Sequence, residues 1–287
     1  MSGQVSEFPA TVYTPSSALA DPCRLIGEMF RDVWAGRELA WRLFIRDTAA
    51  LYRQSVLGYV WAILPPVATT GTFAFLNSQN ILQVGPTPIP YIAYVLTGTL
   101  LWQGFVDALN SPLKAVTANR SLLLKISFPR EALIMSGLFD VLFNAIIRLL
   151  LLVPVFIVFK LPLTATILLF PFGFATLILL GLSLGLFLTP LGMLYTDIGR
   201  GLAIVSTFWL FLTPVVYPPP KSPLALLLST INPVSPVIVT TRNWLISQPA
   251  THLTGLFVVA GLALLLLFAS AIVYRVALPH LIERMGG

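Results

Sequence analysis

Long apolar runs, joined by turns too short to hold a soluble domain, constrain this sequence more than any other feature. A helix needs roughly 20 consecutive apolar residues to cross a membrane. Only 10% of the 287 residues are charged, whereas a soluble domain has about 25%. The chain is therefore predicted to be an all-α, polytopic membrane protein with six transmembrane helices within residues 56–275. The six runs lie at about 56–76, 91–109, 131–159, 163–194, 201–216 and 253–274.

Both ends of the chain are predicted to be cytoplasmic tails. Residues 1–20 are rich in Ser, Thr, Pro and Ala and contain no Lys or Arg, which predicts disorder. They lack the basic start and the apolar stretch of a signal peptide. The first span is therefore expected to act as its own insertion signal. Residues 276–287 form the second tail.

Residues 21–55 are predicted to form two cytoplasmic helices ahead of the first span. Asp21 and Pro22 are typical of a helix start, and Gly36 is the expected end of the first helix. Between them, apolar and charged residues fall on opposite faces, as in a helix that lies in the membrane interface or on a partner protein. The apolar face holds Leu25, Ile26, Met29, Phe30, Val33 and Trp34.

The second of these helices is predicted to begin near Arg37 and to run without a break into the first span. Residues 38, 42 and 46 are charged and lie four positions apart, so they form one stripe. Pro65 and Pro66 lie within the span, where they should interrupt the backbone hydrogen bonds and kink the helix. A charged cytoplasmic helix, here called the lever, that runs directly into a membrane helix indicates a transport protein rather than an anchor.

Residues 218–250, between the fifth and sixth runs, predict a re-entrant helical hairpin. Two apolar pieces, 224–231 and 237–246, are each too short to cross a bilayer, and prolines precede and separate them. Irregular backbone enters a membrane only where it is packed inside protein. We therefore expect the hairpin to dip into the membrane from its far side.

The basic residues predict the orientation. The N-terminal region has six, the loop after the second run has four, and Arg200, Arg275 and Arg284 complete a set of thirteen on one side. Only Lys160, Lys221 and Arg242 are expected on the other side. Cytoplasmic loops are enriched in Lys and Arg. Both termini are therefore predicted to be cytoplasmic, which an even number of spans allows.

No residue pattern predicts catalysis. The phosphate-loop motif G-x-x-x-x-G-K-[ST] does not occur, so ATP and Mg²⁺ would bind to a separate chain. His252 and His280 are expected on opposite sides of the membrane, which excludes a shared metal site. The arginines flank apolar runs and form no basic domain, so nucleic-acid binding is not expected. We expect no catalytic residue, metal or cofactor on this chain.

The loop after the second run, about 117–128, predicts a short amphipathic helix with leucines and positive charge. Its residues Arg120, Leu122, Leu123 and Lys125 precede Phe128. One interpretation is a solvated loop near anionic lipid heads. The other is a plug that fits a groove on a partner protein. The leucines favour the partner, because a solvated loop has no use for an apolar ridge.

The third run carries a polar stripe. Ser136, Asp140, Asn144 and Arg148 recur every four residues, so they share one helix face. Asp140 and Arg148 lie about 12 Å apart along the axis, too far to pair. Each is expected to find another partner or water, because a charge in mid-bilayer costs at least about 2.5–3.5 kcal/mol. The stripe is either inter-helix glue or a hydrated pathway or latch, and in the second case Arg148→Leu should harm export more than assembly.

The stretch RDTAALYRQSVLGYVWAILPP, residues 46–66, resembles the entry to the first span in type-2 ABC exporter permeases of the polysaccharide and polyol-phosphate group. These proteins export O-antigen, capsule or teichoic acid. The residues Lys125, Phe128, Pro129, Arg130 and Glu131 are similar to that family's coupling region. The resemblance extends over about residues 24–275. The matching positions of the first stretch are Arg46, Asp47, Tyr52, Arg53, Gln54, Leu57, Gly58, Trp61 and Pro65.

This resemblance implies a homodimer in the bacterial inner membrane, with one central channel and two copies of a cytoplasmic ATPase. The loop helix, together with Arg46 and Arg53, would couple to the ATPase, and the hairpin would shape the periplasmic exit. A lipid-linked glycan would pass along spans one and five, where aromatic rings can stack on sugars. The candidate lining residues are Tyr59, Trp61, Phe73, Phe75, Phe208, Trp209, Phe211 and Tyr217.

Two other functions remain open from the sequence. A type-2 ABC exporter of a drug or plain lipid would share this architecture but would have less need of an aromatic channel. An ATP-independent carrier would be expected to contain inverted repeats and matched acidic residues in mid-span. Only Asp140 is clearly central, and no repeat is apparent.

Overall fold

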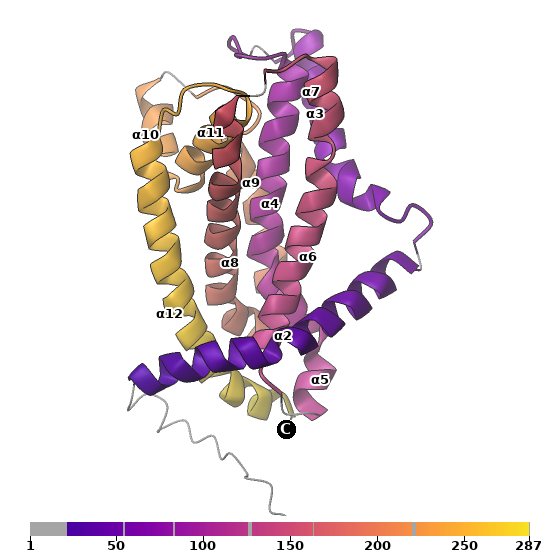
Figure 1. Cartoon of the computed structure of the whole chain (residues 1–287), viewed down its shortest axis with the longest axis vertical. Helices are drawn as coiled ribbons and strands as arrows, with labels where there is room; N and C mark the ends of the chain where they lie inside the picture. The colour runs from indigo at the N-terminus through magenta and orange to yellow at the C-terminus, as the bar shows by residue number, and fades with distance from the viewer. Residues whose placement is uncertain are drawn as a thin grey trace, which may run out of the picture.

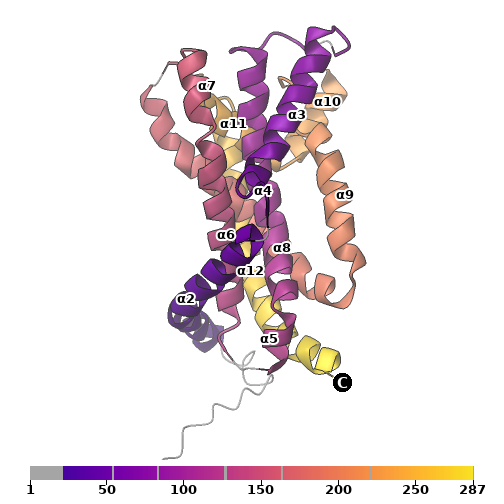
Figure 2. The ribbon, with the colours of Figure 1, turned by 90° about the vertical axis from the view of Figure 1, so that its right-hand side faces the viewer.

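The computed structural model describes residues 22–53, 55–82, 84–125, 128–162, 164–219 and 222–286. Within these ranges the chain is helical and contains no strand, which confirms the all-α class. The helices form a tall bundle, and α2 lies across its lower end (Figures 1 and 2). The elements are α2 (Pro22–Arg53), α3 (Val60–Ser78), α4 (Tyr91–Ala118), α5 (Arg120–Lys125), α6 (Glu131–Leu149), α7 (Leu152–Val158), a 3-10 helix (Ala165–Leu169), α8 (Phe170–Leu194), α9 (Asp197–Leu212), α10 (Pro223–Ile231), α11 (Val234–Leu245) and α12 (Leu253–Gly286).

Four stretches are long and apolar enough to cross a membrane. They are Tyr91–Ala118, Glu131–Val158, Ala165–Leu194 and Leu253–Arg284, and they correspond to the predicted second, third, fourth and sixth spans. The predicted first and fifth spans are α3 and α9, which have 19 and 16 residues. The chain is thus an integral membrane protein, whereas the count of six spans stays a prediction.

The centre of the bundle is the contact between α4 and α8, with α12 on the other side of α8 (Figure 1). Two glycines of α8 let the helix backbones approach closely. A methyl group at Gly181 would overlap the Phe105 carbonyl, and one at Gly185 would overlap the Leu109 carbonyl. Small residues of this kind are common where membrane helices pack, because they maximise dispersion contact.

Helix α2 differs from the predicted pair of helices. It begins at Pro22 as expected but continues through Gly36 to Arg53. Gly36 does not end the helix because it serves a contact: a methyl group there would lie 3.2 Å from the Ala132 Cβ of α6. Arg275 of α12 fixes the same helix by pairing with Asp32 at 2.7 Å and with Glu131 of α6 at 2.9 Å.

The predicted continuity between the lever and the first span is wrong. Helix α2 ends at Arg53 and α3 begins only at Val60. Gly58 adopts a φ of +49°, a left-handed conformation that glycine adopts without strain. The Ser55 Oγ accepts a hydrogen bond of 3.0 Å from the Gly58 N–H, which stabilises this turn. The chain therefore changes direction between α2 and α3.

Several boundaries also differ from the predictions. Helix α4 continues beyond the predicted end at residue 109, through Pro112 to Ala118. Asp107 therefore lies well inside the helix. The loop helix is shorter than 117–128 and spans Arg120–Lys125, while residues 126 and 127 lie outside the described ranges. Most of the predicted C-terminal tail continues α12. Residues 1–20, the predicted N-terminal tail, also lie outside the described part.

Helices α10 and α11 occupy the predicted hairpin, at the end of the bundle opposite α2 (Figure 1). Helix α11 is almost entirely buried and packs against α8, α12 and α4. It thus belongs to the folded core, and its re-entrant position in a membrane stays a prediction.

Candidate functional site: a helix junction, a polar stripe and an aromatic pocket

The junction between α2 and α5 is held by Asn119, the buried residue between α4 and α5. The guanidinium of Arg46 donates a hydrogen bond to the Asn119 Oδ1, and the Asn119 Nδ2 donates to the Asp47 carboxylate at 3.4 Å. The same Nδ2 donates to the Ala115 carbonyl at 3.0 Å. These bonds connect the junction of α4 and α5 to α2.

The predicted coupling leucines, Leu122 and Leu123, face the interior of the protein. Leu123 is only 6% exposed and packs with Leu43, Val116, Leu133 and other apolar residues. Leu123 is therefore not part of an exposed ridge on α5, and its assignment to an ATPase contact stays a prediction. Its neighbour Leu124, which was not singled out from the sequence, is 42% exposed. The predicted residues Arg120, Lys125 and Arg53 are also exposed, whereas Leu122 and Phe128 are partly buried against the same cluster as Leu123.

The polar stripe of α6 faces α3 and α4. As expected from the spacing, Asp140 and Arg148 do not pair with each other. The Nζ of Lys114 lies 3.1 Å from the Asp140 carboxylate, and the Asn144 Nδ2 donates to the Asp140 backbone carbonyl at 2.9 Å. Ser136 is buried in the N-terminal half of α6. The Lys114–Asp140 pair joins α4 to α6, as expected of a structural contact between helices, whereas the Asn144 bond lies within α6. A hydrated pathway stays a prediction.

Arg148, which is only 8% exposed, joins three helices. Its Nη1 forms an ion pair with Asp107 of α4, and its Nε donates to the Ala62 carbonyl of α3 at 2.8 Å. Pro66 has no N–H, so it cannot bond the carbonyl of Ala62 four residues earlier in α3. Arg148 supplies the missing donor. The helix accordingly runs through both prolines without ending.

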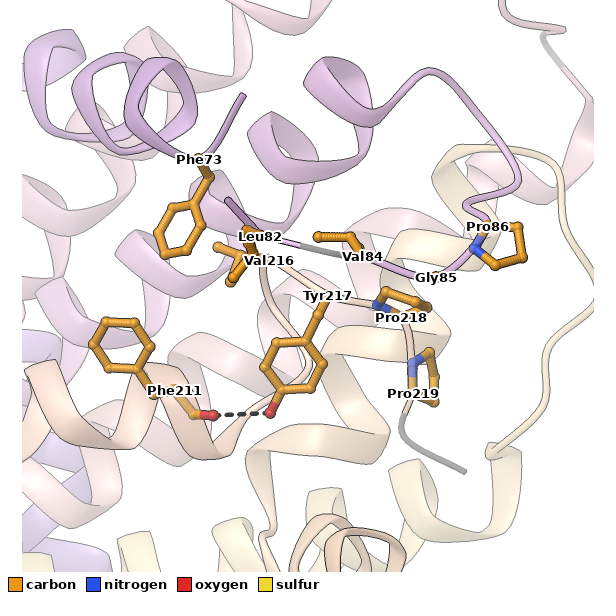
Figure 3. A pocket seen from close by; sticks show the side chains of 10 residues that line it. All are labelled: Phe73, Leu82, Val84, Gly85, Pro86, Phe211, Val216, Tyr217, Pro218 and Pro219. Carbon is orange, nitrogen blue, oxygen red and sulfur yellow. Dashed lines mark hydrogen bonds between the residues drawn. The ribbon is translucent and has the colours of Figure 1, made fainter. Parts of the chain in front are cut away.

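An aromatic pocket of about 600 Å³ lies where the ends of α3 and α9 meet, and Figure 3 shows its lining. This volume is within the range of roughly 300–1,000 Å³ that is typical of ligand sites. Three candidate lining residues, Phe73, Phe211 and Tyr217, converge on it from segments far apart in the sequence. The other lining residues are Leu82, Val84, Gly85, Pro86, Val216, Pro218 and Pro219.

The aromatic rings of the pocket are fixed by contacts among themselves. The ring centroids of Phe73 and Phe211 lie 6.4 Å apart. The Tyr217 hydroxyl donates a hydrogen bond of 2.8 Å to the Phe211 carbonyl (Figure 3). An apolar wall with one polar handle suits a ligand that has both an apolar face and hydroxyl groups.

The other lining candidates lie outside this pocket. Phe208, Phe75, Trp61 and Tyr59 are exposed, and Tyr59 packs against Phe143 of α6. Trp209 is held by contacts within the subunit. Its ring packs edge-on against Trp102 and Phe105, and its Nε1 donates to the Asn232 Oδ1 at 3.0 Å, so it joins the helices, while a lining role stays a prediction.

Residues 38–246 match the ABC-2 type transporter family. The chain belongs to this family. The O-antigen export system permease protein RfbA of Myxococcus xanthus is 25% identical over 251 residues, which cover 86% of this chain and 95% of that protein. An RfbA of Klebsiella pneumoniae is 24% identical over 205 residues, 69% of this chain and 76% of its own length. The resemblance inferred from residues 46–66 is thereby confirmed.

Membership of the ABC-2 transporter family means that ATP is hydrolysed by another chain. An ABC transporter uses an ATPase, and this sequence has no phosphate-loop motif. The described residues contain no group of three or more His, Cys, Asp or Glu that could hold a metal ion. The ABC-2 subunit itself therefore supplies the membrane part of the transporter.

Proposed function

We propose that this chain is the permease subunit of an exporter that moves a lipid-linked polysaccharide of the O-antigen, capsule or teichoic-acid type across the bacterial inner membrane. Two copies form a homodimer, each with six spans and cytoplasmic termini. Two copies of a cytoplasmic ATPase bind ATP and Mg²⁺ and drive the movement. The similarity to O-antigen export permeases supports the substrate class.

The observation that carries this proposal is the aromatic pocket between α3 and α9. Phe73 and Phe211 belong to α3 and α9, the helices that the family resemblance implies line a passage, and Tyr217 follows α9. Aromatic rings stack on the apolar face of a sugar ring while the sugar hydroxyls keep hydrogen-bond partners. An exposed apolar surface continues from the pocket along α9, which forms an edge of the bundle (Figure 2). A second copy of the chain would cover this surface.

Surface glycan in a deletion strain tests the substrate. The strain carries plasmid copies of the wild type, of Phe211→Ala or of Phe268→Ala, a matched change of an exposed ring on α12. The proposal expects surface glycan to be absent from the deletion strain, restored by the wild type and the control, and reduced about two- to tenfold by Phe211→Ala, since a ring contact is worth about 0.5–1.5 kcal/mol. Normal surface glycan in the deletion strain would favour a drug or lipid exporter instead.

Docking of the ATPase is tested separately on α5. Leu124→Asp places a charge on the exposed face of the helix and should reduce copurification of the ATPase while the subunit stays in the membrane. Ser121→Asp, another exposed position on α5, controls for the added charge. Copurification at the wild-type level in Leu124→Asp would remove α5 from the coupling interface.

A further inference from the structure

The chain leaves helical conformation immediately after α9, and this irregular segment forms one wall of the aromatic pocket. Residues 213–219 follow Leu212, and four of them, Val216, Tyr217, Pro218 and Pro219, line the pocket. Backbone carbonyls that leave a helix inside apolar surroundings must find other donors. The groups that donate hydrogen bonds to this segment therefore also determine the position of this wall of the pocket.

Three side chains donate to three consecutive carbonyls of the wall. The Nη1 of Arg242 donates to the Val215 carbonyl at 3.0 Å. The hydroxyl of Tyr91 donates to the Val216 carbonyl at 3.0 Å, and that of Tyr94 to the Tyr217 carbonyl at 3.3 Å. Tyr91 and Tyr94 lie on the first turns of α4, whereas Arg242 comes from α11. The wall is thus held by two helices that do not line the pocket.

The surroundings of Arg242 leave its guanidinium little freedom. The residue is 1% exposed, and its guanidinium carbon lies 3.8 Å from the centroid of the Tyr94 ring. No carboxylate pairs with Arg242 among the residues that the structure describes. A methyl group at Gly98 of α4 would overlap the Val215 carbonyl and lie 3.2 Å from the Arg242 Nη1. Arg242 therefore bonds a backbone carbonyl and an aromatic face in a space shaped for them.

We propose that Tyr91, Tyr94 and Arg242 are positioning residues of the aromatic pocket: they fix the wall against which a sugar ring stacks and so set the shape of ligand that the pocket accepts. The identity of the ligand rests on the proposed function, whereas the hydrogen bonds that fix the wall do not depend on it. The hydroxyl of Tyr274, a buried tyrosine of α12, has no hydrogen-bond partner in the described part of the chain. Tyr274→Phe is therefore a matched control for loss of a tyrosine hydroxyl.

The test measures how fast a cysteine placed opposite the wall reacts. Val84→Cys, in a background with Cys23→Ser, puts a thiol on the loop side of the pocket. The variant is purified with its ATPase in lipid nanodiscs and labelled with N-ethylmaleimide. Tyr91→Phe, Tyr94→Phe and Arg242→Met should each raise the labelling rate about fivefold, the effect of one lost hydrogen bond. Gly98→Ala should also raise it, because the added methyl group would displace the Val215 carbonyl. Tyr274→Phe should leave the rate unchanged.

Unchanged labelling in the tyrosine variants and in Gly98→Ala would overturn the positioning role, even if Arg242→Met fails to fold. An equal increase in Tyr274→Phe would overturn it too, because the effect would then be general loosening. Oligosaccharides released from the host's own surface glycan form a second arm. They should slow labelling of Val84→Cys, with about a fivefold weaker apparent affinity in Tyr94→Phe. Faster labelling in the variants without any protection by oligosaccharide would support the positioning role and contradict the glycan ligand.

Discussion

Two buried arginines, Arg148 and Arg242, perform the same task at different places in the bundle and with different partners. Each donates to a backbone carbonyl that has lost its helical partner, Ala62 because of Pro66 and Val215 because α9 has ended. Arg148 also pairs with a carboxylate, that of Asp107, whereas Arg242 stacks on the ring of Tyr94. At these two sites a buried cation replaces a missing backbone donor, and the second partner determines how costly the loss of each cation is.

Arg148→Leu should have the largest effect. The change leaves the Asp107 carboxylate buried without its partner, and breaking a buried pair in this way costs about 3–5 kcal/mol. Loss of folded protein is therefore expected, rather than the loss of export alone that a latch would give. Thermal melting of the purified subunit measures it. The double variant Arg148→Leu/Asp107→Leu should recover most of the loss, and a double variant as unstable as the single one would contradict the pairing.

Arg242→Met should have a smaller effect, because no carboxylate is left behind. One carbonyl, that of Val215, loses its donor, at a cost of about 1–3 kcal/mol. The same melting experiment should rank Arg242→Met clearly above Arg148→Leu in stability. Equal losses of stability in the two variants would mean that the second partner does not determine how costly the loss of each arginine is.

Pro66→Ala tests whether Arg148 replaces the hydrogen-bond donor that Pro66 lacks. The alanine restores an N–H that can bond the Ala62 carbonyl, so this carbonyl no longer depends on Arg148. In a double-mutant cycle with Arg148→Leu/Asp107→Leu, we expect a coupling free energy of about 1 kcal/mol, the net value of one hydrogen bond. Additive effects would mean that the proline pair and Arg148 act independently.

Tyr91→Phe should have the smallest effect. It removes one partly buried hydrogen bond to the Val216 carbonyl and keeps the ring, so the expected loss is about 0.5–1.5 kcal/mol. Melting should separate it from Tyr274→Phe, which removes a hydroxyl without a described partner. A loss larger than that of Arg242→Met would show that the tyrosine, and not the arginine, is the main support of the wall.

The sequence by itself determined the features that depend on local composition. Long uncharged runs predict membrane helices whatever their neighbours are, and four of the six predicted runs were found as such. The residues around Arg46 and Lys125 were sufficient to indicate the family. The spacing of Asp140 and Arg148 predicted correctly that the two do not pair, because helix geometry alone sets that distance.

Tertiary structure decided which face of each helix meets which neighbour. Leu123 and Leu124 are equivalent in composition, yet one is buried and the other exposed, because only packing against Leu43 and Leu133 distinguishes them. Gly36 could end a helix or allow close contact with Ala132. The packing of α2 against α6 decides in favour of the contact. The pocket unites Phe73 with Phe211 and Tyr217 across more than 130 residues. No local pattern encodes such a meeting, since it arises from the way α3, α4, α9 and α11 pack together.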